Sequence, residues 1–266
     1  MIDIGINLTN QRFDKDRVDV ISRARNANVS GLIITGTNIE ESTKALALCQ
    51  RFESQFPEML FSTAGVHPHD ADHVSKDYLE QITEMAKKRH VKAIGECGLD
   101  FNRNFSEPDQ QQKVFSAQVQ LAANLQLPIF LHQRDAFQPW FETLKPYFNK
   151  IPAMIAHCFT GTKEELVDCI KADMYIGITG WLCDERRGQS LREIVHLIPQ
   201  DRLLIETDAP YLTPRTIRPK PKSSRNEPAY LPYVLKELAN ILAIEESVLA
   251  AQTRLNSIRA FNLELL

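Results

Sequence analysis

Residues 154–166 read Met-Ile-Ala-His-Cys-Phe-Thr-Gly-Thr-Lys-Glu-Glu-Leu. A short apolar run ends at His157, and an apolar run without alternating polar residues is typical of a strand that is covered on both faces. The pattern Thr162-x-x-Glu165 that follows resembles a capping box, which is typical of the first turn of a helix. The stretch therefore predicts a buried strand, a polar side chain at its carboxyl end, and then a helix.

The same order recurs along the chain. Apolar runs at residues 60–66, 91–95, 129–131 and 202–205 end in residues that can hold a metal or move a proton, namely His67, Glu96, His132, and the pair Glu206 and Asp208. The run at 4–8 carries Asn7, and only the run at 32–34 ends in the unreactive Thr35-Gly36. Polar groups at the same end of successive buried strands converge only if the strands are parallel, so the pattern predicts one shared site.

Eight such strands alternate with helical patterns, which predicts a (β/α)8 TIM barrel with its active site at the carboxyl ends of the strands. Helices are expected at 13–28, after Asn38-x-x-Glu41, and after Ser106-x-x-Asp109. A chain of 266 residues suits a single TIM-barrel catalytic domain over 1–266. The alternative is an open doubly wound sheet, which usually has a glycine-rich first turn that this sequence lacks.

Composition limits the classes of partner. The formal net charge is −3, so any contact with nucleic acid must come from a local basic patch. The five cysteines show no zinc-ribbon or redox spacing, which favours reduced thiols in a cytosolic protein. The chain shows no leader pattern and no apolar run approaching about 18 residues, so we expect a cytoplasmic protein that does not insert into a membrane.

Glu96, His132 and His157 form a set of two imidazoles and one carboxylate, which suits a divalent ion such as zinc or manganese. Asp208 could bind the same ion or take a proton from its water. His67 could be a further ligand or a donor to a substrate oxygen, and Glu206 could orient a ligand. Taken singly, each residue is more often structural; their shared position at strand ends favours a site.

Two polar segments offer contacts for a polyanion. Between 212 and 230 five cations face one acid, Glu227, and prolines forbid a helix: Arg215, Arg218, Lys220, Lys222 and Arg225. Residues 184–188 bring Arg186 and Arg187, either as a solvated loop or for contact with phosphate. Trp181 could stack on bases or pack at the rim. We expect His73, His90 and His196 at the surface, and Cys97 in the packed interior.

Several motifs together resemble the TatD family of metal-dependent deoxyribonucleases. They are Gly-Val-His67-Pro-His, Gly-Glu96-Cys-Gly-Leu-Asp100, His132-x-Arg134-Asp135, His157-Cys-Phe-Thr-Gly161 and Glu206-Thr-Asp208-Ala-Pro-Tyr. The resemblance runs from Asp3 to the Arg225-Asn-Glu-Pro228 segment. It implies an amidohydrolase-like TIM barrel and 3′-to-5′ exonuclease activity on single-stranded DNA and RNA, with a role in DNA repair or degradation.

The resemblance also implies residue roles. Glu96, His132 and His157 match the metal ligands, Asp208 the metal-linked acid or base, His67 a histidine near the scissile phosphate, and Glu206 an accompanying acid. Many relatives begin with Asp-x-His-x-His, whereas this chain has Asp3-Ile-Gly5-Ile-Asn7. We therefore expect one firmly held ion, with a second that joins with substrate phosphate. Magnesium suits this behaviour, and manganese or zinc is an alternative.

Three functions follow, and all remain open on sequence alone. The first is hydrolysis of phosphodiester bonds at the 3′ ends of single-stranded DNA or RNA by a monomer, with Arg186, Arg187, Arg215, Arg225 and Trp181 contacting the strand. The second is a metal-dependent amidohydrolase acting on a small C–N or ester substrate. The third is a binding module without catalysis.

Overall fold

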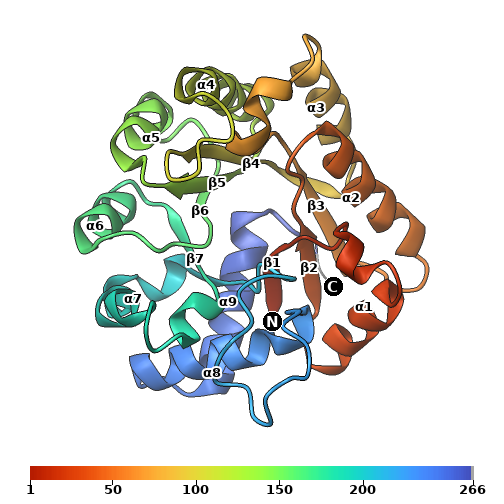
Figure 1. Cartoon of the computed structure of the whole chain (residues 1–266), viewed down its shortest axis with the longest axis vertical. Coiled ribbons are helices and arrows are strands. Elements are labelled where there is room, and N and C mark those ends of the chain that lie inside the picture. The colour runs from red at the N-terminus through yellow and green to blue at the C-terminus, as the bar shows by residue number, and fades with distance from the viewer. Residues whose placement is uncertain (265–266) are drawn as a thin grey trace. The chain divides into compact units, whose positions relative to one another are not determined.

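The computed structural model describes residues 1–264. Eight strands are neighbours in chain order in one parallel sheet, and helices alternate with them (Figure 1). The strands are β1 (Ile2–Ile6), β2 (Gly31–Ile34), β3 (Leu60–Ala64), β4 (Val91–Asp100), β5 (Ile129–Arg134), β6 (Met154–Ala156), β7 (Tyr175–Ile178) and β8 (Leu203–Ile205). The helices are α1 (Arg17–Asn26), α2 (Ile39–Phe52), α3 (Tyr78–Ala86), α4 (Pro108–Leu125), α5 (Phe137–Leu144), α6 (Lys163–Lys171), α7 (Gln189–Ile194), α8 (Leu231–Leu242) and α9 (Glu246–Ala260).

The chain divides into two compact units. Unit 1 comprises Met1–Ile34, Cys158–Arg259 and the residues from Leu263, and unit 2 comprises Thr35–His157 with Ala260–Asn262. Each unit thus contains four strands. That the whole chain acts as one catalytic domain stays a prediction.

Unit 1 contains the strands from both ends of the chain. β1 pairs in parallel with β2, and β7 pairs in parallel with β8. The segment after β8 returns to β1, because Ile6 and Ala209 form a parallel bridge and Asp208 N donates to Gly5 O at 2.9 Å. A last strand that meets the first belongs to a barrel and not to an open sheet, so the predicted (β/α)8 class is confirmed.

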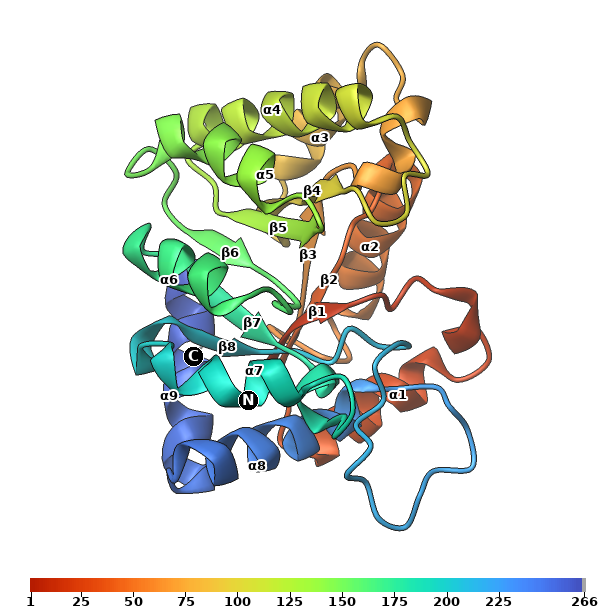
Figure 2. The ribbon, with the colours of Figure 1, turned by 60° about the vertical axis from the view of Figure 1, so that its left-hand side comes forward.

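Unit 2 carries β3 to β6, and its strands are buried because helices cover them. β3–β4, β4–β5 and β5–β6 are all parallel pairs. Figure 2 shows α4 and α5 lying along β4 and β5. The residues of β3 are all buried, and so are nearly all of those of β4, which explains the continuous apolar runs of the sequence.

Two of the predicted helix starts are confirmed by their capping contacts. Thr162 and Glu165 form a full capping box at α6, and the Asn38 side chain accepts from Glu41 N at α2. The third predicted start, with Ser106 as the capping residue, was wrong. Helix α4 begins at Pro108 after Glu107, and the Ser106 hydroxyl instead donates to His69 O at 2.9 Å. Proline at the first helical position needs no amide donor, which favours this later start.

No helix within residues 1–264 is both long enough and apolar enough to cross a bilayer.

Candidate active site

Glu96 lies inside strand β4 rather than after it, and Gly95 makes that position possible. Gly95 has φ +132°, and a Cβ atom there would lie 2.3 Å from Phe130 O on β5. Only glycine allows both this backbone conformation and this close approach. The sequence marked the residue as the end of an apolar run; its real role is to let β4 lie tightly against β5 where Glu96 turns inward.

The unreactive Thr35-Gly36 segment also serves the site, through its main chain. Gly36 O accepts from Glu96 N at 2.7 Å, and Thr37 O accepts from His67 N at 2.7 Å. The segment after β2 therefore fixes the backbones of two site residues. These are main-chain contacts, so no reactive side chain marks them in the sequence.

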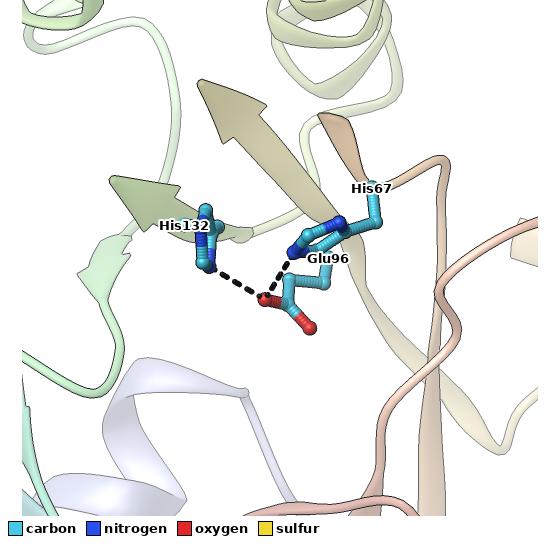
Figure 3. A group of neighbouring side chains, drawn as sticks. All are labelled: His67, Glu96 and His132. Carbon is cyan, nitrogen blue, oxygen red and sulfur yellow. Dashed lines mark ion pairs between the residues drawn. The ribbon is translucent and has the colours of Figure 1, made fainter. Parts of the chain in front are cut away.

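Four of the predicted residues meet around one carboxylate oxygen in unit 2. Glu96 Oε1 lies 2.8 Å from His157 Nε2, 3.0 Å from His132 Nδ1 and 3.4 Å from His67 Nε2. The ligand atoms of His67, Glu96 and His132 all lie within 4.8 Å of one another (Figure 3). Figure 3 shows both imidazoles directed at the carboxylate. The convergence expected of His67, Glu96, His132 and His157 is thus observed.

The charges in this cluster depend on one another. Burial by itself would raise the pKa of Glu96, but the imidazoles of His157, His67 and His132 hold that pKa well below its usual range. Burial lowers the pKa of His67 to about 4, so its ring is neutral near pH 7. For His132 burial acts in the same direction, but Asp100 and Glu96 outweigh it and raise the pKa. The cluster therefore keeps its carboxylate ionised.

Hydrogen bonds indicate which ring nitrogens are free to bind a cation. His67 Nδ1 accepts from His69 N at 3.1 Å, so the proton of the neutral His67 ring lies on Nε2, the atom that faces Glu96. A protonated nitrogen donates and does not coordinate. The geometry therefore favours His67 as a hydrogen-bond donor, although its distances alone would also allow a ligand.

His132 shows the opposite arrangement. Its Nε2 lies 3.4 Å from Asp100 Oδ2, while Nδ1 faces Glu96. At this ion-pair distance Nε2 forms no hydrogen bond, but the carboxylate attracts the outer edge of the ring, and the inner nitrogen is the one directed at Glu96. Asp100 also lies 2.7 Å from His69 Nε2, and burial, which would raise its pKa, is outweighed by these two histidines, so the pKa falls. Asp100 lies within one of the family motifs, and the sequence pattern predicted no role for it.

This donor set fits a divalent cation. One ionised carboxylate oxygen and the inner nitrogens of His132 and His157 meet where Glu96 and His157 are buried and His132 is partly exposed, and this mixed ligation suits several divalent ions. The Asp100 carboxylate behind His132 supplies the outer support that metal-bound histidines normally have. The residues therefore could hold a metal, and the donor set does not select one ion.

Asp208 and Glu206 belong to unit 1. Asp208 adopts φ +53° directly after the strand, and its Oδ1 accepts from Asn7 Nδ2 at 3.1 Å. Glu206 is fully buried and accepts from Cys158 N. Asn7, which stands where many relatives have a histidine, therefore contacts the carboxylate of Asp208. The roles of Asp208 and Glu206 stay predictions.

The residues predicted to contact substrate divide into two groups within unit 1. Arg186 and Arg215 line a pocket of about 670 Å³ together with Arg218 and Lys220. Arg215 also pairs with Asp184 at 3.2 Å, and the other three make intramolecular contacts as well. Arg187 lies 4.5 Å above the Trp181 ring, whose Nε1 donates to Arg187 O, and Arg225 pairs with both oxygens of Asp16 at 2.7 Å.

One surface assignment was wrong. His90 is only 7% exposed, and its Nε2 lies 2.5 Å from Glu53 Oε2. It directly precedes β4, and its carbonyl oxygen accepts from Ser62 N on β3 at 2.8 Å, so the residue is packed against the sheet. Cys97 is buried as expected, and burial raises the pKa of its thiol.

A family model described as TatD related DNase matches residues 2–262. The chain belongs to this family. The resemblance drawn from the motifs is thereby confirmed, and it covers nearly the whole sequence.

Named relatives are similar over their full length. The 3′-5′ ssDNA/RNA exonuclease TatD of Erwinia tasmaniensis is 54% identical over 263 residues, covering 99% of this chain and 100% of that protein. The 3′-5′ ssDNA/RNA exonuclease TatD of Escherichia coli K12 is 52% identical over 256 residues, or 96% of each chain.

Solved structures share the fold. A hydrolase TatD family protein from Entamoeba histolytica superposes with a TM-score of 0.90 at 26% identity, covering 99% of this chain and 98% of that one. A TatD homologue from Escherichia coli K12 gives a TM-score of 0.88 at 26% identity with the same coverage. The fold assigned from the strand order therefore agrees with that of its family.

Proposed function

We propose that the protein is a metal-dependent 3′-to-5′ exonuclease that hydrolyses the phosphodiester bonds of single-stranded DNA and RNA. The observation that carries the proposal is the convergence of His67, His132 and His157 on one oxygen of Glu96. The names of relatives above 50% identity supply the substrate class.

A divalent ion held by Glu96, His132 and His157 would supply an activated water and stabilise charge on the phosphoryl oxygens. A role for Asp208 as a further ligand stays a prediction. We favour Mg²⁺, with Mn²⁺ or Zn²⁺ as alternatives and a second ion dependent on substrate phosphate. Mg²⁺ retains several water ligands and is usually also coordinated by substrate phosphate oxygens. This suits a chain whose first strand has Gly5 and Asn7 in place of histidines.

Each side chain then has a task of its own. Asp208 takes the proton of the attacking water, and the accompanying Glu206 keeps its segment in place through Cys158 N. His67, neutral because burial lowers its pKa to about 4, donates from Nε2 to a phosphoryl oxygen. Asp100 is the ion-pair partner of the outer nitrogen of His132. A donor aimed at charge that develops in the transition state lowers the barrier to reaction.

The basic pocket of unit 1 supports a polyanionic substrate. Four cations line it, and its two acids are Asp184 and Glu185, of which Asp184 is already paired with Arg187 and Arg215. We assign Arg186 and Arg215 to internal phosphates of the strand, and Arg187 with Trp181 to a base. Phosphate contact by Arg225 stays a prediction, and such contact would compete with Asp16.

This pocket argues against a small neutral amide or ester as the substrate, because a neutral molecule carries no negative charge with which four cations could pair. Cytoplasmic location, action as a monomer and a role in DNA repair or degradation stay predictions.

The deciding experiment uses single-stranded oligonucleotides labelled at either end, with Mg²⁺ added or removed by EDTA. We expect early release of a 3′ label, a ladder of shortened products from a 5′ label, and no product in EDTA. His132→Ala should be inert while it still folds. Activity in His132→Ala equal to that of the parent would overturn the proposed site, and release of the 5′ label first would overturn the direction.

A further inference from the structure

Phe105 is an exposed aromatic residue next to the metal-ligand cluster. It lies in the loop between β4 and α4, and 61% of its surface is exposed, the largest fraction among the large apolar residues of the described chain. Its ring meets the His69 ring edge-on, with centroids 4.7 Å apart, and His69 in turn lies 4.2 Å from His67. One imidazole therefore separates Phe105 from a residue of the cluster, and all of them belong to unit 2.

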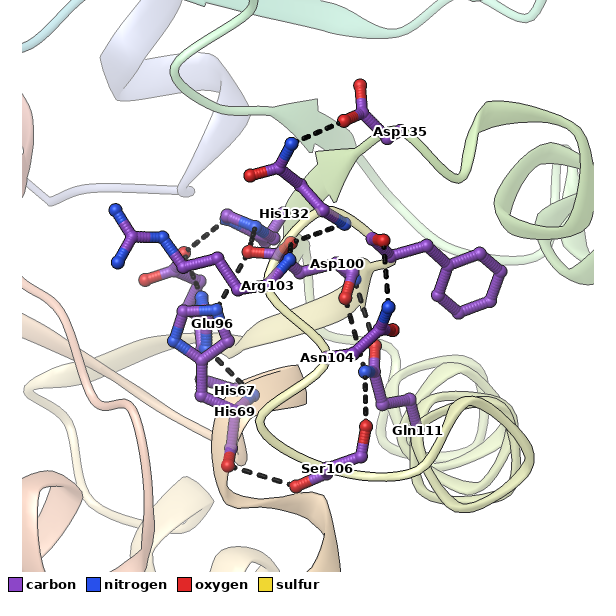
Figure 4. A network of polar contacts seen from close by, with 12 residues as sticks. His67, His69, Glu96, Asp100, Arg103, Asn104, Ser106, Gln111, His132 and Asp135 are labelled. Carbon is purple, nitrogen blue, oxygen red and sulfur yellow. Dashed lines mark hydrogen bonds and ion pairs between the residues drawn. The ribbon is translucent and has the colours of Figure 1, made fainter.

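The loop that carries Phe105 is tied down at both ends. Buried Gln111 accepts from Asp100 N and donates to the carbonyl oxygens of Asp100 and Ser106, at 2.9, 3.2 and 2.8 Å. Ser106 donates to His69 O at 2.9 Å (Figure 4). A loop held in this way presents its exposed ring in one place, at little cost in ordering entropy when a ligand binds.

A cation accompanies the ring. The Arg103 guanidinium lies 5.9 Å from the Phe105 centroid, and the Arg103 amide donates to Asp100 Oδ1 at 3.0 Å. The same carboxyl group that faces His132 and His69 thus also positions the backbone of the loop. An aromatic face beside a guanidinium is the arrangement with which proteins hold single-stranded nucleic acid, the ring by stacking on a base and the cation by contact with phosphate.

We propose that Phe105 stacks on a nucleobase within the last two nucleotides of the strand, and that Arg103 contacts the adjoining phosphate. The proposal rests on the proposed function and adds a binding contact to it. Stacking uses the π-face that every base has, so the contact requires a base without selecting a sequence. A strand that lacks the base has nothing to stack.

The test compares an ordinary oligonucleotide with matched oligonucleotides that carry an abasic site at the last or the penultimate position. Phe105→Ala should lower kcat/KM on the ordinary strand about 5- to 150-fold, mainly through KM. It should leave turnover unchanged on the strand whose contacted base is missing. Phe105→Trp should retain the parent activity. Val248→Ala, at a 56% exposed apolar residue on α9, is the matched control and should change nothing.

A binding measurement separates this proposal from the nuclease proposal. In EDTA, a strand with 2-aminopurine at the contacted position should be quenched by the parent and not by Phe105→Ala. Arg103→Gln should reduce the log–log salt slope of binding by about 0.7, the value of one phosphate contact on a single strand.

An equal loss in Phe105→Ala on ordinary and abasic strands, or no loss on either, would overturn the stacking role. Unchanged quenching in that variant, or no binding by the parent, would overturn it as well. Quenching that depends on Phe105 in a protein that releases no product would instead keep the stacking contact and reject the nuclease.

Discussion

Asp3 shows how a single buried acid makes stability depend on pH. Its carboxylate is fully buried in β1 and accepts from Thr207 N and Thr207 Oγ1. Burial raises its pKa from 3.8 to about 7, in spite of these hydrogen bonds. Between about pH 4 and pH 7 the folded protein therefore binds more protons than the unfolded chain, so the free energy of unfolding falls as pH rises through this window.

We predict that Asp3→Asn removes part of this pH dependence. An asparagine amide keeps an acceptor for Thr207 N and has no charge to bury. The variant should become more stable relative to the parent as pH rises from 4 to 7, by on the order of 1 kcal/mol in free energy of unfolding per pH unit. Urea unfolding at several pH values measures it. Asp3→Ala is the control: it removes the same titration and also leaves the Thr207 donors unpaired, so it should be about 1–3 kcal/mol less stable than Asp3→Asn at every pH.

A second single residue, Asp100, affects the proposed metal site. Its carboxylate lies 3.4 Å from His132 Nε2, where it orients the ring. We predict that Asp100→Ala weakens Mn²⁺ binding about 10- to 100-fold, as removal of such an outer partner usually does. Calorimetric titration measures the affinity. Asp135→Asn is the matched control, since Asp135 accepts from Asn102 on the same loop without facing a proposed ligand. Equal affinity in Asp100→Ala and the parent would show that Asp100 only shapes the loop.

At the scale of elements, a charge network fastens the end of the long loop between β8 and α8. Arg225 pairs with both oxygens of Asp16, and Arg23 bonds both oxygens of Glu227 at 2.8 and 2.7 Å. Buried Asn226 donates to Thr207 O at 2.9 Å. The Arg225-Asn-Glu-Pro228 segment is thus an anchor on α1 and on the segment after β8. Hydrogen bonds from Arg225 lower the pKa of Asp16 to about 2, so the network's contribution is complete above about pH 4 and is lost only as pH falls towards 2.

We predict that Asp16→Asn loosens this loop more than it destabilises the fold. The side chain of Asp16 is 27% exposed, so its pairs contribute only about 1 kcal/mol to global stability. Trypsin cleavage after Arg215 and Lys222 should become several-fold faster, whereas Arg218 and Lys220 precede proline and resist cleavage. Asp14→Asn is the control, because Asp14 pairs only with Arg17 on the surface. If trypsin cleavage of Asp16→Asn is unchanged while its melting temperature falls below that of the parent, the role of this segment as an anchor is contradicted.

For the whole molecule, the balance of charge predicts a steep response to salt from a few local cations. The net charge is −3, so non-specific attraction of a polyanion is weak and the basic pocket must supply it. We predict that Arg186→Gln and Lys220→Gln each reduce the log–log salt slope of oligonucleotide binding by about 0.7. Anisotropy titrations between 50 and 200 mM salt measure the slope. Lys171→Gln, on α6 and outside the pocket, should leave it unchanged; an equal change there would mean that total charge and not the pocket is responsible.

The site was predictable wherever a reactive side chain follows an apolar run. Glu96, His132 and His157 were found in this way because parallel strands place their carboxyl ends at one edge. No role was predicted for Asp100, because the apolar run ends at residue 95 whereas the strand itself continues to Asp100. His90 was misplaced because its ion pair with Glu53 joins positions 37 residues apart.

The sequence by itself determined the alternation of strands and helices, the caps at Asn38 and Thr162, and which residues carry reactive groups. These depend on short-range periodicity and on hydrogen bonds within one helical turn. Only the tertiary structure decided that Gly36 supplies a backbone acceptor to Glu96, that the His67 proton lies on the nitrogen facing Glu96, and that Arg225 pairs with Asp16. These contacts join segments, or orient ring atoms, in ways that no local pattern encodes, since their partners are chosen by packing in three dimensions.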